Sequence, residues 1–476
     1  MTLRQGYKKQ GEHNPVMTQR FGADPYALVY EGRVYLYMTG DTFIRDENGE
    51  VMENVYSQID RINVISSEDL VNWTDHGTVY AAGANGAAPW GKNSWAPAAA
   101  CKEIDGVMKF FLYFANGGNG IAVLEADSPT GPFTDRLGKP LISRQTPACS
   151  DVTWLFDPAV LVDDDGEAYL YFGGGIPNAD MAANPGTARV VQLGGDMQSL
   201  RGTPVVIADV PYLFEDSGIN KINGRYYYSY CSNFSIPEEQ VSSLGFDKGE
   251  ILVMTSTNPM GPFELVGPIL KNPGWFFGLE GNNHHCMFQF MDQWYMAYHT
   301  RILEERMGIL QNYRSTSIDS VQIDGNGRIS SIQATREGVA QTQPFYPYCK
   351  HKAVTMAAMG GITTTQYGED AVKYGSGEML LTGISDGSWI QLCGVDFGEK
   401  MVQCLEMTVR GTQGGCVKAY LDSPHGTCLC ETALIPGDTQ EFTVCKGIVN
   451  RRLNGIHDLY FVFQGEGYEV YDWRFV

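Results

Sequence analysis

Asp24-Pro-Tyr-Ala-Leu-Val-Tyr-Glu-Gly-Arg-Val-Tyr-Leu-Tyr-Met38 predicts two β-strands joined by a turn at Glu31-Gly32, with a carboxylate at the head of the first strand. Apolar and aromatic residues favour strands, and glycine supplies the positive φ that a tight turn needs. The same two-strand unit recurs four more times along the chain, at intervals of roughly 60 to 75 residues. The other copies begin at Trp95, Phe156, Phe214 and His284.

Five copies of this unit predict an all-β fold, a five-bladed β-propeller, because each interval is long enough for a four-stranded sheet. The alternative is a β-sandwich, since alternating strands and glycine turns occur in every all-β fold. Two near copies outside the hairpins, 127–133 (DSPTGPF) and 257–263 (TNPMGPF), favour the repeat. A chain of 476 residues also exceeds what one core usually serves. We therefore expect a propeller over residues 1–342 and a smaller domain over 343–476.

Three carboxylates occupy one position of the repeat. Asp24 lies eight residues before the turn glycine of its copy, and Asp157 and Glu215 each lie nine residues before theirs. Either Asp-Pro alone would be interpreted as a turn. In a propeller, however, the first strand of each blade lines the central axis, so equivalent strand starts meet at one end of the channel. The shared register predicts one pocket containing all three acids.

Such a pocket suits glycoside hydrolysis. Burial and mutual repulsion raise the pKa of at least one clustered carboxyl group. The reaction needs one protonated carboxyl group to donate to the leaving oxygen and one ionised carboxylate to act on water or carbon. A third carboxylate can tune and orient the acid.

Other candidate binding residues stand near the same strand starts. The fifth copy begins with His284-His285 where others have acids, and an alternating strand points only one of them toward the axis. Arg301 follows the last strand of that copy and could reach the pocket. Aromatic rings stack on the apolar face of a sugar. The aromatic candidates are Trp95, Trp154 and Phe156.

The amino-acid composition limits the kinds of molecule that the protein is expected to bind. The formal net charge of −21 disfavours binding to nucleic acid or to an anionic membrane surface. Residues 1–10 contain no apolar segment, and no later run reaches the length of a membrane span, so we expect a cytoplasmic protein with no membrane partner. The eleven cysteines form no Cys-x-x-Cys pair and are expected to be reduced. The sequence does not predict the oligomeric state.

Taken together, the motifs resemble glycoside hydrolase family 43, in the branch of arabinofuranosidases, arabinoxylan arabinofuranohydrolases and β-xylosidases. The resemblance implies a five-bladed propeller and an inverting mechanism, with Asp24 as general base, Glu215 as general acid, and Asp157 setting the pKa and orientation of the acid. The segments that carry it are 14–17 (NPVM), 22–28 (GADPYAL), 67–73 (SEDLVNW), 95–97 (WAP), 156–159 (FDPA), 214–215 (FE) and 281–285 (GNNHH).

The same resemblance implies a calcium ion in the channel, held largely through water near His285, and places Arg301 close to the substrate. It predicts an exo-acting glycosidase that releases α-L-arabinofuranose, with β-D-xylose as a second product, from arabinoxylan or arabinan oligosaccharides. One alternative is an endo-acting arabinanase or xylanase, which needs an open groove. The other is a non-catalytic carbohydrate-binding propeller, which the presence of all three acids disfavours.

The C-terminal region contains four further motifs: 387–392 (GSWIQL), 395–398 (VDFG), 420–424 (YLDSP) and 455–463 (GIHDLYFVF). With these motifs the region resembles a family 6 carbohydrate-binding module, which implies a β-sandwich of the jelly-roll type over residues 343–476. Relatives that bind xylan carry a tryptophan just before the strand at Gln440, where this chain has Gly437-Asp-Thr-Gln440. We therefore expect weak or no glycan binding here and a structural role, completing the rim of the active site.

Overall fold

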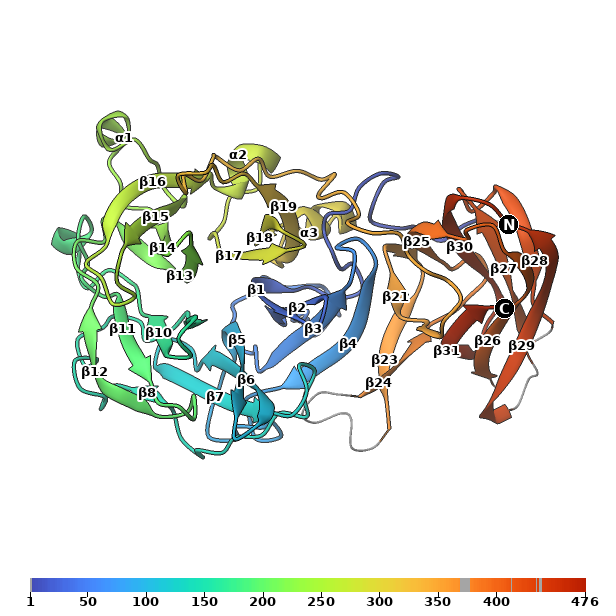
Figure 1. Cartoon of the computed structure of the whole chain (residues 1–476), viewed down its shortest axis with the longest axis horizontal. Helices are drawn as coiled ribbons and strands as arrows, with labels where there is room; N and C mark the ends of the chain where they lie inside the picture. The colour runs from blue at the N-terminus through green and yellow to red at the C-terminus, as the bar shows by residue number, and fades with distance from the viewer. Residues whose placement is uncertain (1, 369–376, 412, 434, 436–438) are drawn as a thin grey trace.

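Five β-sheets surround a central channel in the larger domain, and two further sheets face each other in the C-terminal domain (Figure 1). The computed structural model describes residues 2–368, 377–411, 413–433, 435 and 439–476. The predicted five-bladed propeller followed by a β-sandwich is confirmed. The α-helices described are short, and none is long and apolar enough to span a membrane. They are α1 (Glu238–Leu244), α2 (Pro273–Phe277) and α3 (Ile302–Met307).

Each blade is an antiparallel sheet whose strands follow one another in the chain. The first blade contains β1 (Ala23–Tyr30), β2 (Arg33–Thr39), β3 (Arg61–Ser67) and β4 (Trp73–Tyr80). The second contains β5 (Trp95–Ile104), β6 (Val107–Ala115), β7 (Gly120–Ala126) and β8 (Ile142–Ser143). The third contains β9 (Ala159–Val162), β10 (Ala168–Phe172), β11 (Arg189–Leu193) and β12 (Leu200–Val206). The fourth contains β13 (Leu213–Ile222), β14 (Arg225–Ser232), β15 (Ile251–Ser256) and β16 (Glu264–Leu270).

The fifth blade departs from the expected four strands. Among the described residues it has three: β17 (His285–Phe290), β18 (Gln293–Thr300) and β19 (Ser315–Val321). The first blade, in contrast, gains a fifth strand from the C-terminal part of the chain, because β21 (Thr355–Met356) pairs with β4. The repeat alone could not predict this strand, since its two residues lie beyond the last copy.

The two near copies between the hairpins join neighbouring blades. Tyr37 in β2 donates its hydroxyl to the carbonyl oxygen of Pro129 at 2.5 Å. Tyr171 in β10 makes the same bond to the carbonyl oxygen of Pro259. Both rings are buried, and a buried hydroxyl needs a hydrogen-bond partner. The repeated segment therefore fixes a tyrosine of the preceding blade.

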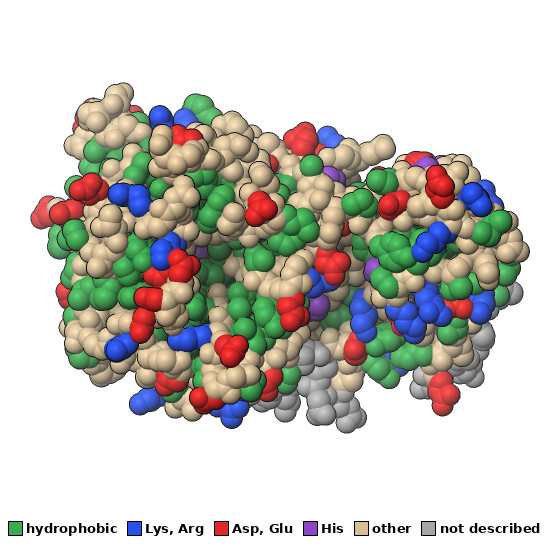
Figure 2. Space-filling view, viewed as in Figure 1, with side chains coloured by type: hydrophobic (Ala, Val, Ile, Leu, Met, Phe, Trp, Pro, Cys, Tyr) green, Lys and Arg blue, Asp and Glu red, His purple; other side chains and the backbone are tan. Residues whose placement is uncertain are grey.

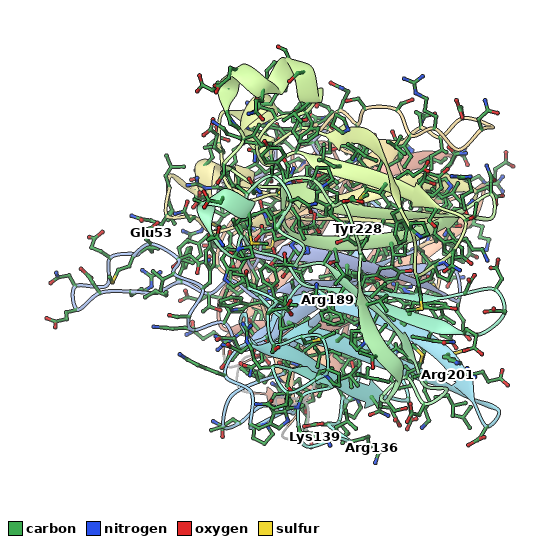
Figure 3. All side chains as sticks on the ribbon, turned by 90° about the vertical axis from the view of Figure 1, so that its left-hand side faces the viewer. Glu53, Arg136, Lys139, Arg189, Arg201 and Tyr228 are labelled. Atoms are coloured by element: carbon green, nitrogen blue, oxygen red, sulfur yellow. The ribbon has the colours of Figure 1, made fainter. Side chains whose placement is uncertain are left out.

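Figure 3 shows two other buried residues, Arg189 and Tyr228, inside the propeller and Arg136, Lys139 and Arg201 at its edge.

The sandwich consists of two antiparallel sheets around an apolar core, and neighbouring strands in each sheet are often not consecutive in the chain. The first sheet contains β22 (Ala358–Gly360), β25 (Trp389–Asp396), β30 (Ile456–Gly465), β27 (Gly415–Leu421) and β28 (Thr427–Glu431). The second contains β23 (Thr363–Tyr367), β24 (Glu378–Thr382), β31 (Tyr468–Phe475), β26 (Met401–Gly411) and β29 (Thr439–Arg452), and β20 (His351–Lys352) pairs with β31. The prediction of weak glycan binding depends on the absence of a tryptophan just before Gln440. Residues 437 and 438 of that segment lie outside the described residues. All eleven cysteines are free.

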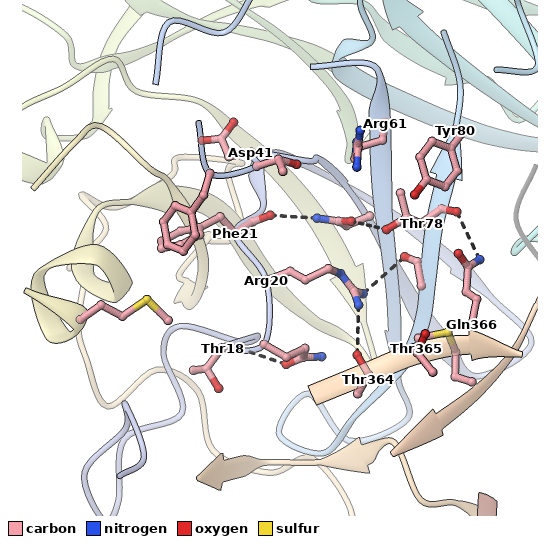
Figure 4. Close-up of a pocket in the computed structure, with 17 residues that line it drawn as sticks. Thr18, Arg20, Phe21, Asp41, Arg61, Thr78, Tyr80, Thr364, Thr365 and Gln366 are labelled. Atoms are coloured by element: carbon pink, nitrogen blue, oxygen red, sulfur yellow. Dashed lines mark hydrogen bonds between the residues drawn. The ribbon is translucent and has the colours of Figure 1, made fainter. Parts of the chain in front are cut away.

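Polar contacts fix the sandwich against the first blade. Arg20 Nη1 and Thr364 Oγ1 both donate to Asp75 Oδ2, at 2.9 Å and 2.6 Å. Arg20 and Thr364 also line a cavity between the domains, where Arg20 Nη1 donates to Thr364 Oγ1 at 3.1 Å (Figure 4). Asn72 exchanges two hydrogen bonds with the backbone of Cys393. The segment 67–73, quoted above for the family resemblance, therefore helps to dock the two domains.

Acidic side chains are spread over the visible propeller face and form no single patch (Figure 2).

Candidate active site

Four innermost strands begin with an unusual backbone conformation. The strands β1, β5, β9, β13 and β17 adjoin one another around the channel. Asp24, Ala96, Asp157 and Asp216, at or just before the first four of them, have φ values of 47°, 40°, 50° and 71°. Positive φ in a residue other than glycine costs of order 1–3 kcal/mol and is concentrated at functional sites. The shared conformation turns these side chains toward one end of the channel.

This conformation corrects the alignment of the fourth copy. The residue equivalent to Asp24 and Asp157 is Asp216, and Glu215 comes one position earlier. Asp216 lies eight residues before Gly224, as Asp24 lies eight residues before Gly32. Asp157 lies nine residues before Gly166, because the turn of the third blade is longer: five residues separate Val162 from Ala168, whereas two separate Tyr30 from Arg33. The count of nine taken from the third copy therefore selected Glu215 instead of Asp216.

The structure nevertheless brings the acids of the three copies together. Asp157 accepts a hydrogen bond from the backbone N–H of Asp216, and His284 lies within 3.8 Å of Asp24, Asp157 and Asp216.

Asp24 is buried beside positive charge. Its Oδ1 accepts a hydrogen bond from Arg314 Nη1 at 2.9 Å, and His299 Nδ1 lies 3.0 Å from the same oxygen. Burial alone would raise the pKa of Asp24. The charge of Arg314, followed by His284 and His299, outweighs burial and holds that pKa well below its usual value. Asp24 is therefore ionised at neutral pH and can accept a proton.

Glu215 has the opposite protonation state. Burial, followed by the negative charge of Asp24, raises the pKa of Glu215 to about 8, although a hydrogen bond from the Asn282 side chain opposes this. Its Oε1 is buried and has no hydrogen-bond partner among the described residues. Glu215 is therefore protonated at neutral pH and can donate to a substrate oxygen.

Asp157 acts on the acid through the backbone. Its Oδ2 accepts a hydrogen bond from the backbone N–H of Asp216 at 2.9 Å. Burial, followed by the negative charges of Glu215 and Asp24, raises the pKa of Asp157 well above its usual value. Because the bonded N–H belongs to the residue after Glu215, Asp157 fixes the chain that carries the acid.

Two histidines complete the polar cluster. His284 Nε2 lies 3.1 Å from Asp216 Oδ1, and its Nδ1 lies 3.6 Å from Asp24 Oδ1 and 3.8 Å from Asp157 Oδ2. His285 Nδ1 lies 2.5 Å from Asp216 Oδ2, and its Nε2 lies 2.7 Å from Ser229 Oγ. Burial lowers the pKa of both imidazoles. The histidine in contact with the catalytic candidates is thus His284, whereas the sequence singled out His285.

The donors around His285 do not form a calcium cage. Calcium takes six to eight oxygen ligands. Among the residues that the structure describes, no group of three or more His, Cys, Asp or Glu side chains is placed to hold a metal ion. Both nitrogens of His285 already have protein partners. The residues present therefore fit an ion only if water supplies most of its ligands.

Arg301, which the sequence analysis placed near the substrate, lines a cavity beside the carboxylates. Arg301 lines a cavity together with Asn282, His299 and Arg314, and its Nη1 donates to the carbonyl oxygen of Glu280 at 2.9 Å. The structure therefore places Arg301 in the same cavity as His299 and Arg314, which contact Asp24.

The three aromatic candidates are not equivalent. Trp95 donates its indole N–H to the carbonyl oxygen of Tyr56 at 3.0 Å. Trp154 is 36% exposed and packs edge-on against Phe156 and Phe214, with ring centroids 5.3 Å and 5.5 Å away. Phe156 is buried beneath it. Trp154 can offer a ring face to a ligand, whereas Phe156 supports the ring of Trp154.

Arg314 is the main residue that the sequence analysis missed. It bonds to Asp24 on one side, and on the other its Nη2 and Nε donate to the two carboxylate oxygens of Asp41 at 2.9 Å and 3.0 Å. Its guanidinium lies 4.6 Å from the centroid of the Tyr56 ring. Arg314 is 290 residues from Asp24 in the chain, and no local pattern marks it. Only the closure of the propeller brings the two residues together.

This fold and this pair of carboxyl groups define a glycoside hydrolase. The chain belongs to glycosyl hydrolases family 43, whose model matches residues 12–329, and the model of carbohydrate binding module family 6 matches residues 352–476. It is 48% identical to an arabinoxylan arabinofuranohydrolase of Paenibacillus polymyxa, over 97% of this chain and 73% of that protein. It is 45% identical to one of Bacillus subtilis (strain 168), over 97% and 91% of the two chains.

Solved structures agree with this assignment. A family 43 arabinoxylan arabinofuranohydrolase from Bacillus subtilis, in complex with cellotetraose, superposes with a TM-score of 0.92 at 43% identity and covers 98% of both chains. An α-L-arabinofuranosidase from Clostridium thermocellum gives a TM-score of 0.52 at 37% identity, over 68% of this chain and 98% of its own.

Proposed function

We propose that the protein is an inverting, exo-acting α-L-arabinofuranosidase that removes arabinose side groups from arabinoxylan-derived oligosaccharides. The observation that carries the proposal is the opposite protonation of Asp24 and Glu215 in one buried pocket. Two carboxyl groups with separated pKa values are the acid and base that glycoside hydrolysis requires. The names of the full-length relatives support arabinoxylan as the substrate class.

In the proposed reaction, Asp24 removes a proton from water as the water oxygen bonds to the anomeric carbon. The bond from that carbon to the leaving oxygen breaks on the opposite face, and Glu215 donates its proton to this oxygen. The anomeric configuration inverts, Asp24 ends protonated and Glu215 ends as a carboxylate. Arg314 keeps the charge on Asp24 before the reaction, and Asp157 fixes the backbone that carries Glu215.

Substrate choice and stereochemistry test the proposal together. We expect kcat/KM for 4-nitrophenyl α-L-arabinofuranoside to exceed that for the β-D-xyloside by at least about tenfold. On arabinoxylan oligosaccharides, arabinose should be released in the β configuration first, as proton NMR at early times measures. Cleavage of the xylose chain without arabinose release would instead support the endo-acting alternative, and initial release of the α anomer would contradict inversion.

A calcium ion enters this proposal only as a water-held ion beside His285. Asp24 is held by a hydrogen bond from Arg314, and Asp157 by one from the backbone N–H of Asp216, so a water-held ion would adjust the electrostatics of the channel and not hold these carboxylates directly. We therefore expect extensive treatment with EDTA to change kcat/KM by less than about twofold. A tenfold loss that added calcium restores would show that the ion holds the site.

A further inference from the structure

A second cavity lies next to the catalytic pocket, on the other side of α2. Pro273 and Leu279 line a small cavity beside the carboxylates, whose other lining residues include Arg314, which bonds to Asp24, and Asn282, which bonds to Glu215. Gly274 and Trp275 line the outer cavity together with residues of α1. The outer cavity has a volume of about 920 Å³. Both helices lie at the same rim of the propeller (Figure 1). The two cavities therefore lie on either side of α2, and we call the outer one the outer cleft.

Two exposed aromatic rings line the outer cleft. Trp275 is 71% exposed and Phe234 is 45% exposed. Lys271 Nζ lies 3.7 Å from the centroid of the Trp275 ring, which fixes the ring without covering most of its surface. Isolated apolar side chains are common on protein surfaces, but two large rings in one cleft beside an active site are less so.

Phe234 also belongs to a row of three aromatic rings. Phe234 packs edge-on against Phe214, with ring centroids 5.4 Å apart, and Phe214 packs against Trp154 at 5.5 Å. The row therefore leads from Trp154 to Phe234 in the outer cleft, and its middle residue, Phe214, is the neighbour of Glu215 in the chain.

The charges of the cleft suit a neutral ligand. Its two lysines, Lys248 and Lys271, are outnumbered by four acids, so the lining does not favour an anion. The acids that line it are Glu238, Asp247, Glu250 and Glu280. An anionic ligand would meet these carboxylates. A neutral sugar, in contrast, can stack its apolar face on a ring and bond its hydroxyls to polar neighbours.

Asn272 ties the cleft to the catalytic pocket. Its Oδ1 accepts the backbone N–H of Gly274 at the start of α2 at 2.9 Å, and its Nδ2 donates to the carbonyl oxygen of Gly281 at 2.9 Å. Gly281 precedes Asn282, whose side chain bonds to Glu215. The position of Trp275 is therefore fixed relative to the acid, as a binding subsite requires.

We propose that the outer cleft binds xylose residues of the main chain, with Trp275 as a stacking platform, while the arabinose side group occupies the catalytic pocket. This inference rests on the proposed function, because it names how the rest of the same substrate is held. It makes Trp275 a residue that determines preference for substituted oligosaccharides over short substrates.

The test separates binding of the main chain from chemistry. In the Trp275→Ala variant we expect KM for a long arabinose-substituted xylo-oligosaccharide to rise about five- to tenfold, with kcat within twofold. Both constants for 4-nitrophenyl α-L-arabinofuranoside should stay unchanged, because that substrate does not reach past α2. Trp275→Phe, which keeps a ring, should restore most of the loss. Tyr346→Ala, which removes a 52% exposed ring away from both cavities, is the control and should change neither constant.

Three outcomes would overturn the inference: an unchanged KM for the oligosaccharide in Trp275→Ala, an equal rise in KM for the aryl substrate, or an equal effect of Tyr346→Ala. Calorimetric titration with unsubstituted xylohexaose checks the cleft without any turnover. We expect Trp275→Ala to weaken this binding by the same factor. Undiminished binding would reject the cleft as a xylose subsite, whereas failure of the wild-type protein to release arabinose would reject the proposed function alone.

Discussion

The Glu215→Gln variant turns over arabinose-substituted oligosaccharides about 10³- to 10⁴-fold more slowly than the wild-type protein, because glutamine cannot donate a proton to the leaving sugar oxygen. With 4-nitrophenyl α-L-arabinofuranoside the loss is much smaller, since 4-nitrophenolate leaves without protonation. Steady-state kcat values for the two substrates measure the difference. Glu215 is the residue for which this contrast is expected, because its pKa is raised to about 8 and it keeps its proton at neutral pH.

Glutamine has nearly the shape of protonated glutamic acid, so the fold should tolerate this change. A melting temperature close to that of the wild-type protein is the control for folding. An oligosaccharide rate near the wild-type value would reject Glu215 as the acid. An equal loss on both substrates would instead indicate that residue 215 acts on the attacking water.

The Asp24→Asn variant loses about 10³- to 10⁴-fold on both substrates, because activation of water is needed whatever the leaving group. Azide, which attacks without a base, should restore part of the rate with the aryl substrate. The variant should fold, since Arg314 keeps its two hydrogen bonds to the Asp41 carboxylate. Rates with and without azide are the measurement.

A matched control for Asp24→Asn is Asp165→Asn, which makes the same chemical change at an exposed turn residue. It should leave both rates unchanged. A loss in Asp24→Asn that depends strongly on the leaving group, with no response to azide, would contradict the assignment of Asp24 as the base.

The repeat in the sequence was sufficient to predict the propeller and the convergence of its acids, because both follow from strand order and from the position of turns. It misplaced the fourth copy by one residue, because the longer turn of the third blade puts Asp157 nine residues before its glycine, and the same count in the fourth copy selects Glu215 instead of Asp216. It also missed Asp216, which shares the left-handed conformation of Asp24 and Asp157.

Contacts between distant segments were beyond local pattern. Arg314 reaches Asp24 only when the last blade closes on the first, and β21 joins the first blade from beyond the repeat. The two adjacent histidines could not be ranked, because alternation along β17 does not say which one meets the carboxylates. The structure places His284 there.

The pH dependence of kcat/KM on an arabinose-substituted oligosaccharide tests most directly whether Glu215 acts as the acid and Asp24 as the base. The acid must be protonated, so activity should be full below the pKa of Glu215 and should fall as the pH rises through about 8. The base must be ionised, and because the pKa of Asp24 is held well below its usual value, activity should persist to below about pH 4. In the Glu215→Gln variant the residual activity should lose the alkaline decline. The same alkaline decline in that variant, or a wild-type decline centred near pH 5, would contradict the account.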